Sequence, residues 1–126
     1  MVNLSVSGAW GRMGQAIIKL ALQNPKTFKI TTLLEYKDHP KLKEKVNGIA
    51  VSADNNSLKG ADVLIEFTLP EATIENLNAC VKHNVKMVIG TTGLNPDQVK
   101  KIEEASKKIP IVFASNMSIG VNVLGF

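Results

Sequence analysis

The fold is decided by a short run near the start of the chain, Val6-Ser7-Gly8-Ala9-Trp10-Gly11-Arg12-Met13-Gly14. In this run an apolar strand ends in glycines and an amphipathic helix begins. Glycines let the backbone turn tightly and approach phosphate oxygens, while the free N–H groups and the positive dipole end of the following helix attract an anion. We therefore predict that this run cradles the pyrophosphate of a dinucleotide, in preference to a merely structural glycine turn.

The run departs from the common dinucleotide fingerprint in one place. Alignment of Gly11 and Gly14 with the second and third fingerprint glycines leaves Ala9 in the first place. Trp10 is unusual beside a phosphate turn. Its indole either lies against the outside of the cofactor or covers the edge of the sheet, and we favour the covering role. Arg12 is a candidate phosphate ligand, although an arginine in a first helical turn more often points into water.

Short β-branched runs alternate with longer amphipathic runs along the chain, a pattern typical of a parallel sheet covered by helices. We predict one α/β domain over residues 1–126, a Rossmann-type, doubly wound parallel sheet of about six strands with helices on both faces. The predicted strands are residues 2–7, 28–34, 49–53, 61–67, 85–89 and 111–114. The predicted helices are residues 12–24, a second helix that ends near 83, and a third that ends near 108.

Two of the predicted helices carry signals for their first turn. Thr68, with Glu71 three positions later, is a candidate capping box. Asn95 is a candidate cap for the next helix, with Pro96 in its first turn and Gln98 three residues on. Each signal starts a helix directly after a strand, so the loops in between lie at the carboxyl edge of the sheet, where doubly wound folds bind ligands.

Glu35 closes the second predicted strand, roughly 20 residues beyond the last glycine of the loop. A carboxylate in that place can accept hydrogen bonds from the ribose diol of adenosine, and it favours NAD because a 2′-phosphate would meet negative charge. Tyr36 is placed to pack on adenine, and Lys37 is placed to screen a 2′-phosphate. NADH and NADPH therefore both stay open as cofactors.

Charge and composition exclude several other classes. The net charge is +4, but the lysines lie beside acidic residues, as on solvated helix faces, and six aromatic residues are too few for a nucleic-acid stacking platform. No apolar run approaches the roughly 20 residues that span a bilayer, and the start Met1-Val2-Asn3-Leu4 has no basic segment followed by an apolar one, so we do not expect secretion. We expect a cytoplasmic protein without membrane or nucleic-acid partners. Cys80 is the single cysteine, no metal-ligating cluster is visible, and His39 and His83 are expected to be structural.

Four ordered blocks resemble the bacterial dihydrodipicolinate reductase family, also called 4-hydroxy-tetrahydrodipicolinate reductase, over nearly the whole chain. The blocks are residues 8–14, Glu66-Phe67-Thr68 before Pro70-Glu71, residues 88–93 and residues 114–122. The resemblance implies that pyrophosphate is bound by Gly8, Ala9, Trp10, Gly11, Arg12 and Met13. It also implies that the adenosine ribose is bound by Glu35, and that the nicotinamide is flanked by Gly90, Thr91, Thr92, Ala114, Ser115, Asn116 and Met117, while Tyr36 stays the candidate adenine contact named above.

The same resemblance implies an activity. The family passes hydride from NADH or NADPH to a cyclic imine dicarboxylate in lysine and diaminopimelate biosynthesis. Family members commonly have a further glycine in place of Trp10 and often an arginine in place of Tyr36, which leaves the cofactor preference open. Their second domain binds and protonates the substrate through a His-His pair, a lysine and an Asp-Ala-Pro-Ser-Gly-Thr segment, none of which is present here. Residues from about 116 would begin the hinge to that domain, as the resemblance implies.

We therefore expect a fragment that binds NADH or NADPH, contains no catalytic residue and is inactive alone, because nothing in it positions the second reactant. The substrate dicarboxylate would bind only together with the second domain, and the resemblance implies a homotetrameric full-length protein. The alternative is a noncatalytic Rossmann module that senses nucleotides and partners a separate subunit.

Overall fold

Strands and helices alternate along residues 1–113 and 122–124, the part of the chain that the computed structural model describes. The strands are β1 (Val2–Ser7), β2 (Phe28–Leu34), β3 (Lys45–Val46), β4 (Ile49–Ser52), β5 (Val63–Glu66), β6 (Lys86–Ile89), β7 (Ile111–Phe113) and β8 (Asn122–Leu124). The helices are α1 (Arg12–Leu22), α2 (Pro70–His83) and α3 (Pro96–Ala105), with a short 3-10 helix η1 (Asn55–Leu58) before β5. The predicted elements are all present, but α1 and α3 end a few residues earlier than predicted.

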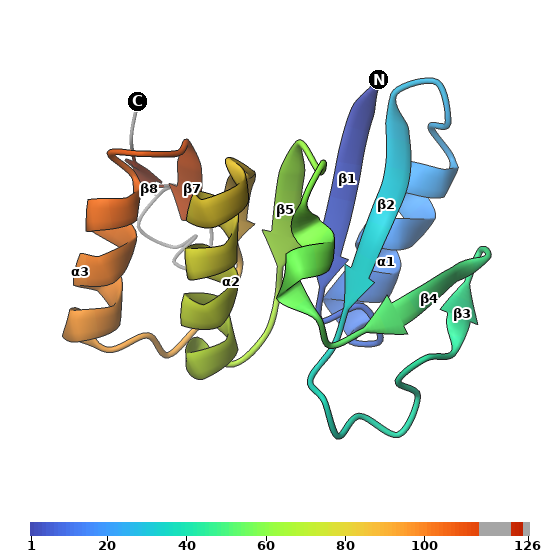
Figure 1. The fold of residues 1–126 in the computed structure, drawn as a ribbon, viewed down its shortest axis with the longest axis horizontal. Helices are drawn as coiled ribbons and strands as arrows, with labels where there is room; N and C mark the ends of the chain where they lie inside the picture. Colours follow the sequence, from blue (N-terminus) through green and yellow to red (C-terminus); the bar gives the residue numbers. More distant parts are fainter. Residues whose placement is uncertain (114–121, 125–126) are drawn as a thin grey trace.

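All eight strands belong to one sheet in the order β3-β4-β2-β1-β5-β6-β7-β8 (Figure 1). The strands from β4 to β7 in this order are parallel, which confirms the predicted doubly wound sheet. β3 and β8 are additional edge strands that pair antiparallel with β4 and β7. The strand order reverses between β1 and β5, and the carboxyl ends of these neighbours define the crevice where such sheets bind ligands.

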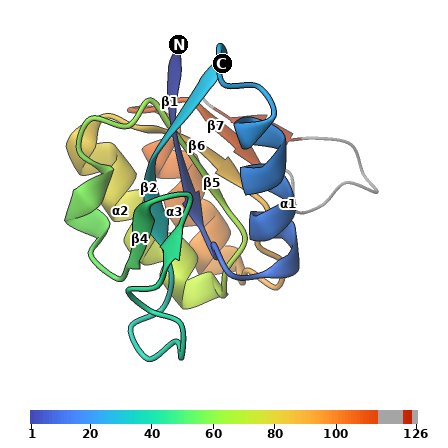
Figure 2. The ribbon, with the colours of Figure 1, turned by 90° about the vertical axis from the view of Figure 1, so that its right-hand side faces the viewer.

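The sheet is covered by helices on both faces. α1 lies on one face, and α2 and α3 lie on the other (Figure 2). The core on the α1 side includes Leu4, Val6, Ile18, Leu33 and Val51. The core on the other side includes Leu64, Leu77, Met87, Ile102 and Ile111. Each buried aliphatic side chain of this kind stabilises the fold by about 1.5–3 kcal/mol, so the strand ends that carry the loops are held firmly. Among the described residues, no helix combines the length and apolarity needed to cross a membrane.

The two predicted helix caps have different outcomes. Asn95 caps α3 as predicted, because its side-chain oxygen accepts from the Gln98 N–H at 2.8 Å and the Gln98 side chain accepts from the Asn95 N–H at 2.9 Å. The predicted capping box of Thr68 and Glu71 is wrong, since no side chain caps the start of α2. The Thr68 hydroxyl instead donates to the Glu66 carboxylate at 2.5 Å. The physical reason is that a buried carboxylate without hydrogen-bond donors costs more free energy than a helix end without a side-chain cap, because water can bind the helix end.

Candidate functional site

A cavity of about 780 Å³ opens where β1, β2 and β5 end, and its size is typical of a small-molecule site. It lies at the point where the strand order reverses. The lining residues are Ser7, Gly8, Trp10, Gly11, Leu34, Glu35, Tyr36, Lys37, Asp38, His39, Ala53, Asn55, Phe67, Thr68, Leu69, Ala72, Glu75 and Asn76. The glycine loop and the carboxylate at the end of β2, which are far apart in the sequence, therefore face the same cavity.

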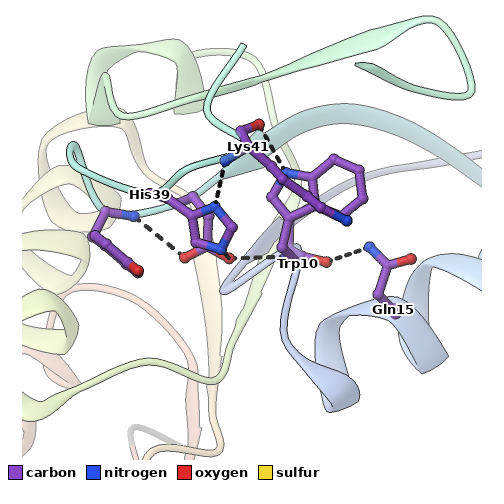
Figure 3. Close-up of polar contacts among 7 residues, drawn as sticks. Trp10, Gln15, His39 and Lys41 are labelled. Atoms are coloured by element: carbon purple, nitrogen blue, oxygen red, sulfur yellow. Dashed lines mark hydrogen bonds and ion pairs between the residues drawn. The ribbon is translucent and has the colours of Figure 1, made fainter. Parts of the chain in front are cut away.

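Close backbone approaches build the glycine loop. Gly8 has a φ of +81°, and a Cβ there would lie 2.0 Å from the carbonyl oxygen of Phe67 at the end of β5. A Cβ on Gly14 would lie 2.1 Å from the Gly8 carbonyl oxygen, so this glycine lets α1 pack directly on the loop. The Gln15 side chain donates to the Ala9 carbonyl at 2.7 Å (Figure 3). The loop is thus a tightly packed strand-to-helix turn whose backbone borders the cavity.

The start of α1 is electrostatically suited to an anion. Gly11 is its N-cap residue, no side chain accepts a hydrogen bond there, and the first turn contains no acidic residue. The first amide N–H groups of an α-helix have no acceptor within the helix, and they carry a partial positive charge. Arg12 and Met13, the first two helical residues, are exposed. A phosphate at this position would meet N–H groups without a competing carboxylate from the helix itself.

Glu35 lies beside the glycine loop, with only 8% of its side chain exposed. Its Oε2 accepts a hydrogen bond from the backbone N–H of Trp10 at 2.9 Å, and its Oε1 accepts from the Tyr36 N–H at 3.3 Å (Figure 3). The Nε2 of His39 lies 4.0 Å from Oε2. These contacts hold the carboxylate at the wall of the cavity, where its remaining lone pairs can accept from a ligand hydroxyl.

The indole of Trp10 contacts the segment that follows β2. Its Nε1–H donates to the Lys41 carbonyl at 3.1 Å, and the Lys41 ammonium lies 4.8 Å from the centre of the ring. Lys41 also donates its backbone N–H to the Nδ1 of His39 at 3.0 Å (Figure 3). The His39 ring in turn meets the Tyr36 ring edge-on at 5.0 Å. The Trp10 indole therefore packs on the segment after β2 and not on the sheet edge, and His39 contacts Lys41 and Tyr36.

A buried carboxylate lies below the loops that follow β5 and β6. Glu66 is fully buried, and its oxygens accept from the hydroxyls of Thr68, Thr73 and Thr91. Burial raises the pKa of the Glu66 carboxyl, and the three threonine hydrogen bonds oppose the rise. The Thr91 hydroxyl also accepts from the Thr68 N–H at 2.9 Å. This cluster joins β5, α2 and the loop after β6 into one unit.

The predicted site residues occupy several distinct places. Gly8, Trp10, Gly11, Glu35 and Tyr36 line the cavity, while Ala9 of the glycine loop and Arg12 and Met13 at the start of α1 do not line it. Gly90, Thr91 and Thr92 follow β6, outside the lining of this cavity, and the Thr91 hydroxyl points inward to Glu66. Ala114, Ser115, Asn116 and Met117 lie outside the described residues.

Some residues of the cavity and its support are not predicted from the sequence. Asn76 of α2 lines the cavity and donates its side-chain N–H to the Ser7 hydroxyl at 3.0 Å. Phe67 also lines it, and a Cβ on Gly90 would lie 2.0 Å from the Phe67 ring. A polar residue on the apolar face of a predicted helix is a detectable signal for Asn76, but its partner is 69 positions away.

A family model and the curated relatives of this chain point to the same protein family. A family model described as "Dihydrodipicolinate reductase, N-terminus" matches residues 2–117. A 4-hydroxy-tetrahydrodipicolinate reductase of Syntrophotalea carbinolica is 39% identical over 131 residues, which cover 97% of this chain and 49% of the relative. The enzyme of the same name from Pelagibacter ubique is 43% identical over 124 residues, covering 98% of this chain and 46% of the relative. The chain thus spans about half the length of these curated relatives.

Solved structures show the same likeness in three dimensions. A dipicolinate-bound dihydrodipicolinate reductase from a Paenisporosarcina species superposes with a TM-score of 0.70 at 25% identity, over 85% of this chain and 43% of that one. A homoserine dehydrogenase from S. aureus also has a TM-score of 0.70, at 16% identity over 87% of this chain and 31% of its own. The second likeness is one of fold alone. Both support a Rossmann-like α/β architecture.

Proposed function

This chain belongs to the dihydrodipicolinate reductase family, and from that premise we propose that it is the NAD(P)H-binding domain of a 4-hydroxy-tetrahydrodipicolinate reductase. The observation that carries the proposal is the cavity at which the glycine loop, the uncapped start of α1 and the Glu35 carboxylate meet. In the proposed reaction, the hydroxylated precursor loses water, and the nicotinamide cofactor, when bound, would supply a hydride to the resulting cyclic imine dicarboxylate, with a proton completing the reduction and the cofactor left oxidised.

The residues present fit a dinucleotide. Backbone N–H groups at the start of α1 and the glycine loop would hold the pyrophosphate, because the helix start is positive and has no side-chain cap. Glu35 would accept from the adenosine ribose, with Tyr36 beside the adenine. Gly90, Thr91 and Thr92, together with Ala114, Ser115, Asn116 and Met117, would flank the nicotinamide, as the family resemblance implies. The backbone of Gly8, Ala9, Trp10, Gly11, Arg12 and Met13 completes the proposed site.

The charge of Glu35 favours NADH over NADPH in this proposal. A 2′-phosphate on the adenosine ribose would approach a carboxylate that is largely buried and held in place by Trp10. Lys37 lines the same cavity and offers a compensating positive charge. We propose that both cofactors bind and that NADH binds more tightly.

We propose that the chain binds cofactor but does not catalyse hydride transfer alone. Orienting the second reactant contributes several kcal/mol to the lowering of a barrier, and the groups that the family uses for this purpose belong to a second domain. The imine dicarboxylate would bind when that domain is present. Homotetramer formation and a cytoplasmic location are parts of the same proposal.

Titration of the chain with NADH, followed by cofactor fluorescence, tests the binding step. We expect saturable binding that ADP-ribose displaces, since the pyrophosphate and adenosine contacts are common to both ligands. Folded protein that shows no saturation at millimolar NADH would overturn the proposal. A nucleic-acid binder, in contrast, would show strong DNA affinity that falls steeply with salt.

A chimera tests the hydride-transfer step. The chain would replace the matching 46% of the Pelagibacter ubique relative, and the remainder of that relative would supply the second domain that the family resemblance implies. We expect the chimera to oxidise NADH in the presence of the imine substrate. A folded chimera that binds NADH but never oxidises it would favour a noncatalytic nucleotide-sensing module instead.

A further inference from the structure

Trp10 joins two parts of the cavity wall that are separate in the sequence. Its backbone N–H donates to Glu35, its indole N–H donates to the Lys41 carbonyl at 3.1 Å, and its ring lies 4.8 Å from the Lys41 ammonium (Figure 3). The glycine loop is thereby tied to residues 36–44, here called the 36–44 segment, which runs between β2 and β3. The first four residues of this segment line the cavity.

The contact with Trp10 matters for the position of the 36–44 segment, because most of the segment's own hydrogen bonds join residues only a few positions apart. The His39 N–H donates to the Tyr36 carbonyl at 3.1 Å, and the Leu42 N–H donates to the His39 carbonyl at 3.0 Å. Local turns of this kind shape a segment without fixing where it lies on the protein. At the far end, the Lys43 N–H is anchored to the Val51 carbonyl of β4 at 2.8 Å. Near the middle, the segment is held by the packing of Leu42 against the core on the α1 side and by the hydrogen bond from the Trp10 indole to Lys41.

We propose that Trp10 is a positioning residue that clasps the 36–44 segment to the glycine loop and so preforms the adenosine end of the cavity. This inference rests on the proposed dinucleotide-binding function. The indole acts on the ligand through the segment it holds: Lys41 is pinned, Lys41 orients His39, and His39 packs beside Tyr36 and Glu35. A wall that is ordered before the ligand arrives does not have to be ordered on binding, so the affinity rises without any added ligand contact.

The variant Trp10→Phe tests the clasp while keeping an aromatic ring at this position. It keeps an aromatic face for Lys41 and the backbone N–H for Glu35, but it removes the indole hydrogen bond to the Lys41 carbonyl. Calorimetric titration with ADP-ribose, which contains the adenosine and pyrophosphate parts of the cofactor but lacks the nicotinamide, should show a dissociation constant raised by about 3- to 10-fold, the range expected for one lost hydrogen bond. Hydrogen exchange of the amides in the 36–44 segment should be faster in this variant, while exchange in α2 and α3 stays the same.

The matched control is Lys41→Met, which removes the ammonium over the ring but leaves the carbonyl that accepts from the indole. Its dissociation constant for ADP-ribose should rise less than that of Trp10→Phe. Equal affinity and equal exchange in wild type and Trp10→Phe would overturn the inference. Failure of the wild-type chain to bind ADP-ribose or NADH would instead overturn the proposed function, so the two failures are distinguishable.

A measurement on the wild-type chain provides a second test that needs no variant. The amides of His39, Lys41 and Leu42 all donate hydrogen bonds in the clasped segment. They should already be protected from hydrogen exchange before ligand is added, and ADP-ribose should add little further protection. Exchange at the rate of an unfolded chain before ligand is added, followed by strong protection with ADP-ribose, would show that the ligand orders the segment and would overturn the inference.

Discussion

The backbone N–H of Trp10 donates a hydrogen bond of 2.9 Å to the side chain of Glu35, 25 positions later in the chain. One oxygen of this carboxylate thus anchors the glycine loop to the end of β2. Because the side chain is only 8% exposed, its charge stays at the cavity wall and is screened weakly by solvent. Under the proposed function, a ribose hydroxyl beside the loop would meet an acceptor there, and a phosphate would meet a like charge.

Replacement of Glu35 by Gln should change the cofactor preference. The amide oxygen can still accept from the Trp10 N–H, but the negative charge that opposes a 2′-phosphate is gone. We expect the ratio of the NADPH and NADH dissociation constants to fall by about tenfold, which corresponds to ~1.4 kcal/mol. Fluorescence titrations of both cofactors measure the ratio. Glu44→Gln is the control, because Glu44 is an exposed acid of the 36–44 segment that does not line the cavity, and an equal shift there would assign the effect to general charge.

Replacement of Gly8 by Ala should destabilise the fold through a specific collision. The new Cβ would meet the Phe67 carbonyl oxygen at 2.0 Å, in addition to the strain of a φ of +81°. We expect a loss of roughly 2–4 kcal/mol in the free energy of unfolding, measured in urea. Gly48 has the same φ, and nothing lies within 4 Å of a Cβ there. Gly48→Ala should therefore cost only about 1 kcal/mol, and equal losses in the two variants would contradict the packing argument.

Glu66 should make stability depend on pH. Burial raises the pKa of this carboxyl above the value of 4.5 that it has when exposed, so the folded state holds the proton more tightly than the unfolded state. The contribution of the tightly held proton to the free energy of unfolding is fully present below pH 4.5, and it is lost as the pH rises through the raised pKa of Glu66. The isosteric variant Glu66→Gln does not titrate. The stability of Glu66→Gln relative to wild type should therefore increase as the pH rises from about 4.5 toward neutrality. The total increase should be up to ~1.4 kcal/mol for each unit by which folding raises the pKa of Glu66.

Urea denaturation at a series of pH values measures this difference. Glu103→Gln, an exposed acid on α3, should run parallel to wild type over the same range. A constant difference between Glu66→Gln and wild type across the range would show that the Glu66 carboxyl has the same pKa in the folded and unfolded states.

Thr91 and Thr92 should respond differently to the same substitution. The Thr91 hydroxyl is buried, donates to Glu66 and accepts from the Thr68 N–H, so Thr91→Val leaves buried polar groups without partners. We expect a loss of about 2–3 kcal/mol in the free energy of unfolding. Thr92 is exposed, and Thr92→Val should change stability by less than about 0.5 kcal/mol. Similar losses in both variants would mean that the Glu66 cluster does not hold the loop.

Much of the fold is predictable because its signals are local. The glycine loop between a strand and a helix, the apolar periods and the Asn95 cap each depend on residues within a few positions of one another. The small edge strand β3 was not predicted, although the dipeptide Asn47-Gly48 that follows it is typical of a two-residue hairpin turn. Asn47 and Gly48 both have positive φ, as a two-residue hairpin turn requires, and they join β3 to β4.

The site is predictable only in part, because its contacts join distant residues. Thr68 has the right spacing for a helix cap, yet its hydroxyl binds Glu66, a partner whose burial depends on the whole sheet. The contact of Trp10 with Lys41 spans 31 positions, and no local pattern marks it.

Local residue order was thus sufficient for the strand-to-helix loop, for the parallel sheet and for the placing of a carboxylate at the end of β2, since short-range sterics and apolar periodicity govern all three. Folding in three dimensions was needed to direct Thr91 inward, to bury Glu66 and to lay the Trp10 indole against Lys41. The physical reason is that a polar side chain takes whichever partner packing brings within hydrogen-bonding distance once water is excluded, and packing depends on the entire chain.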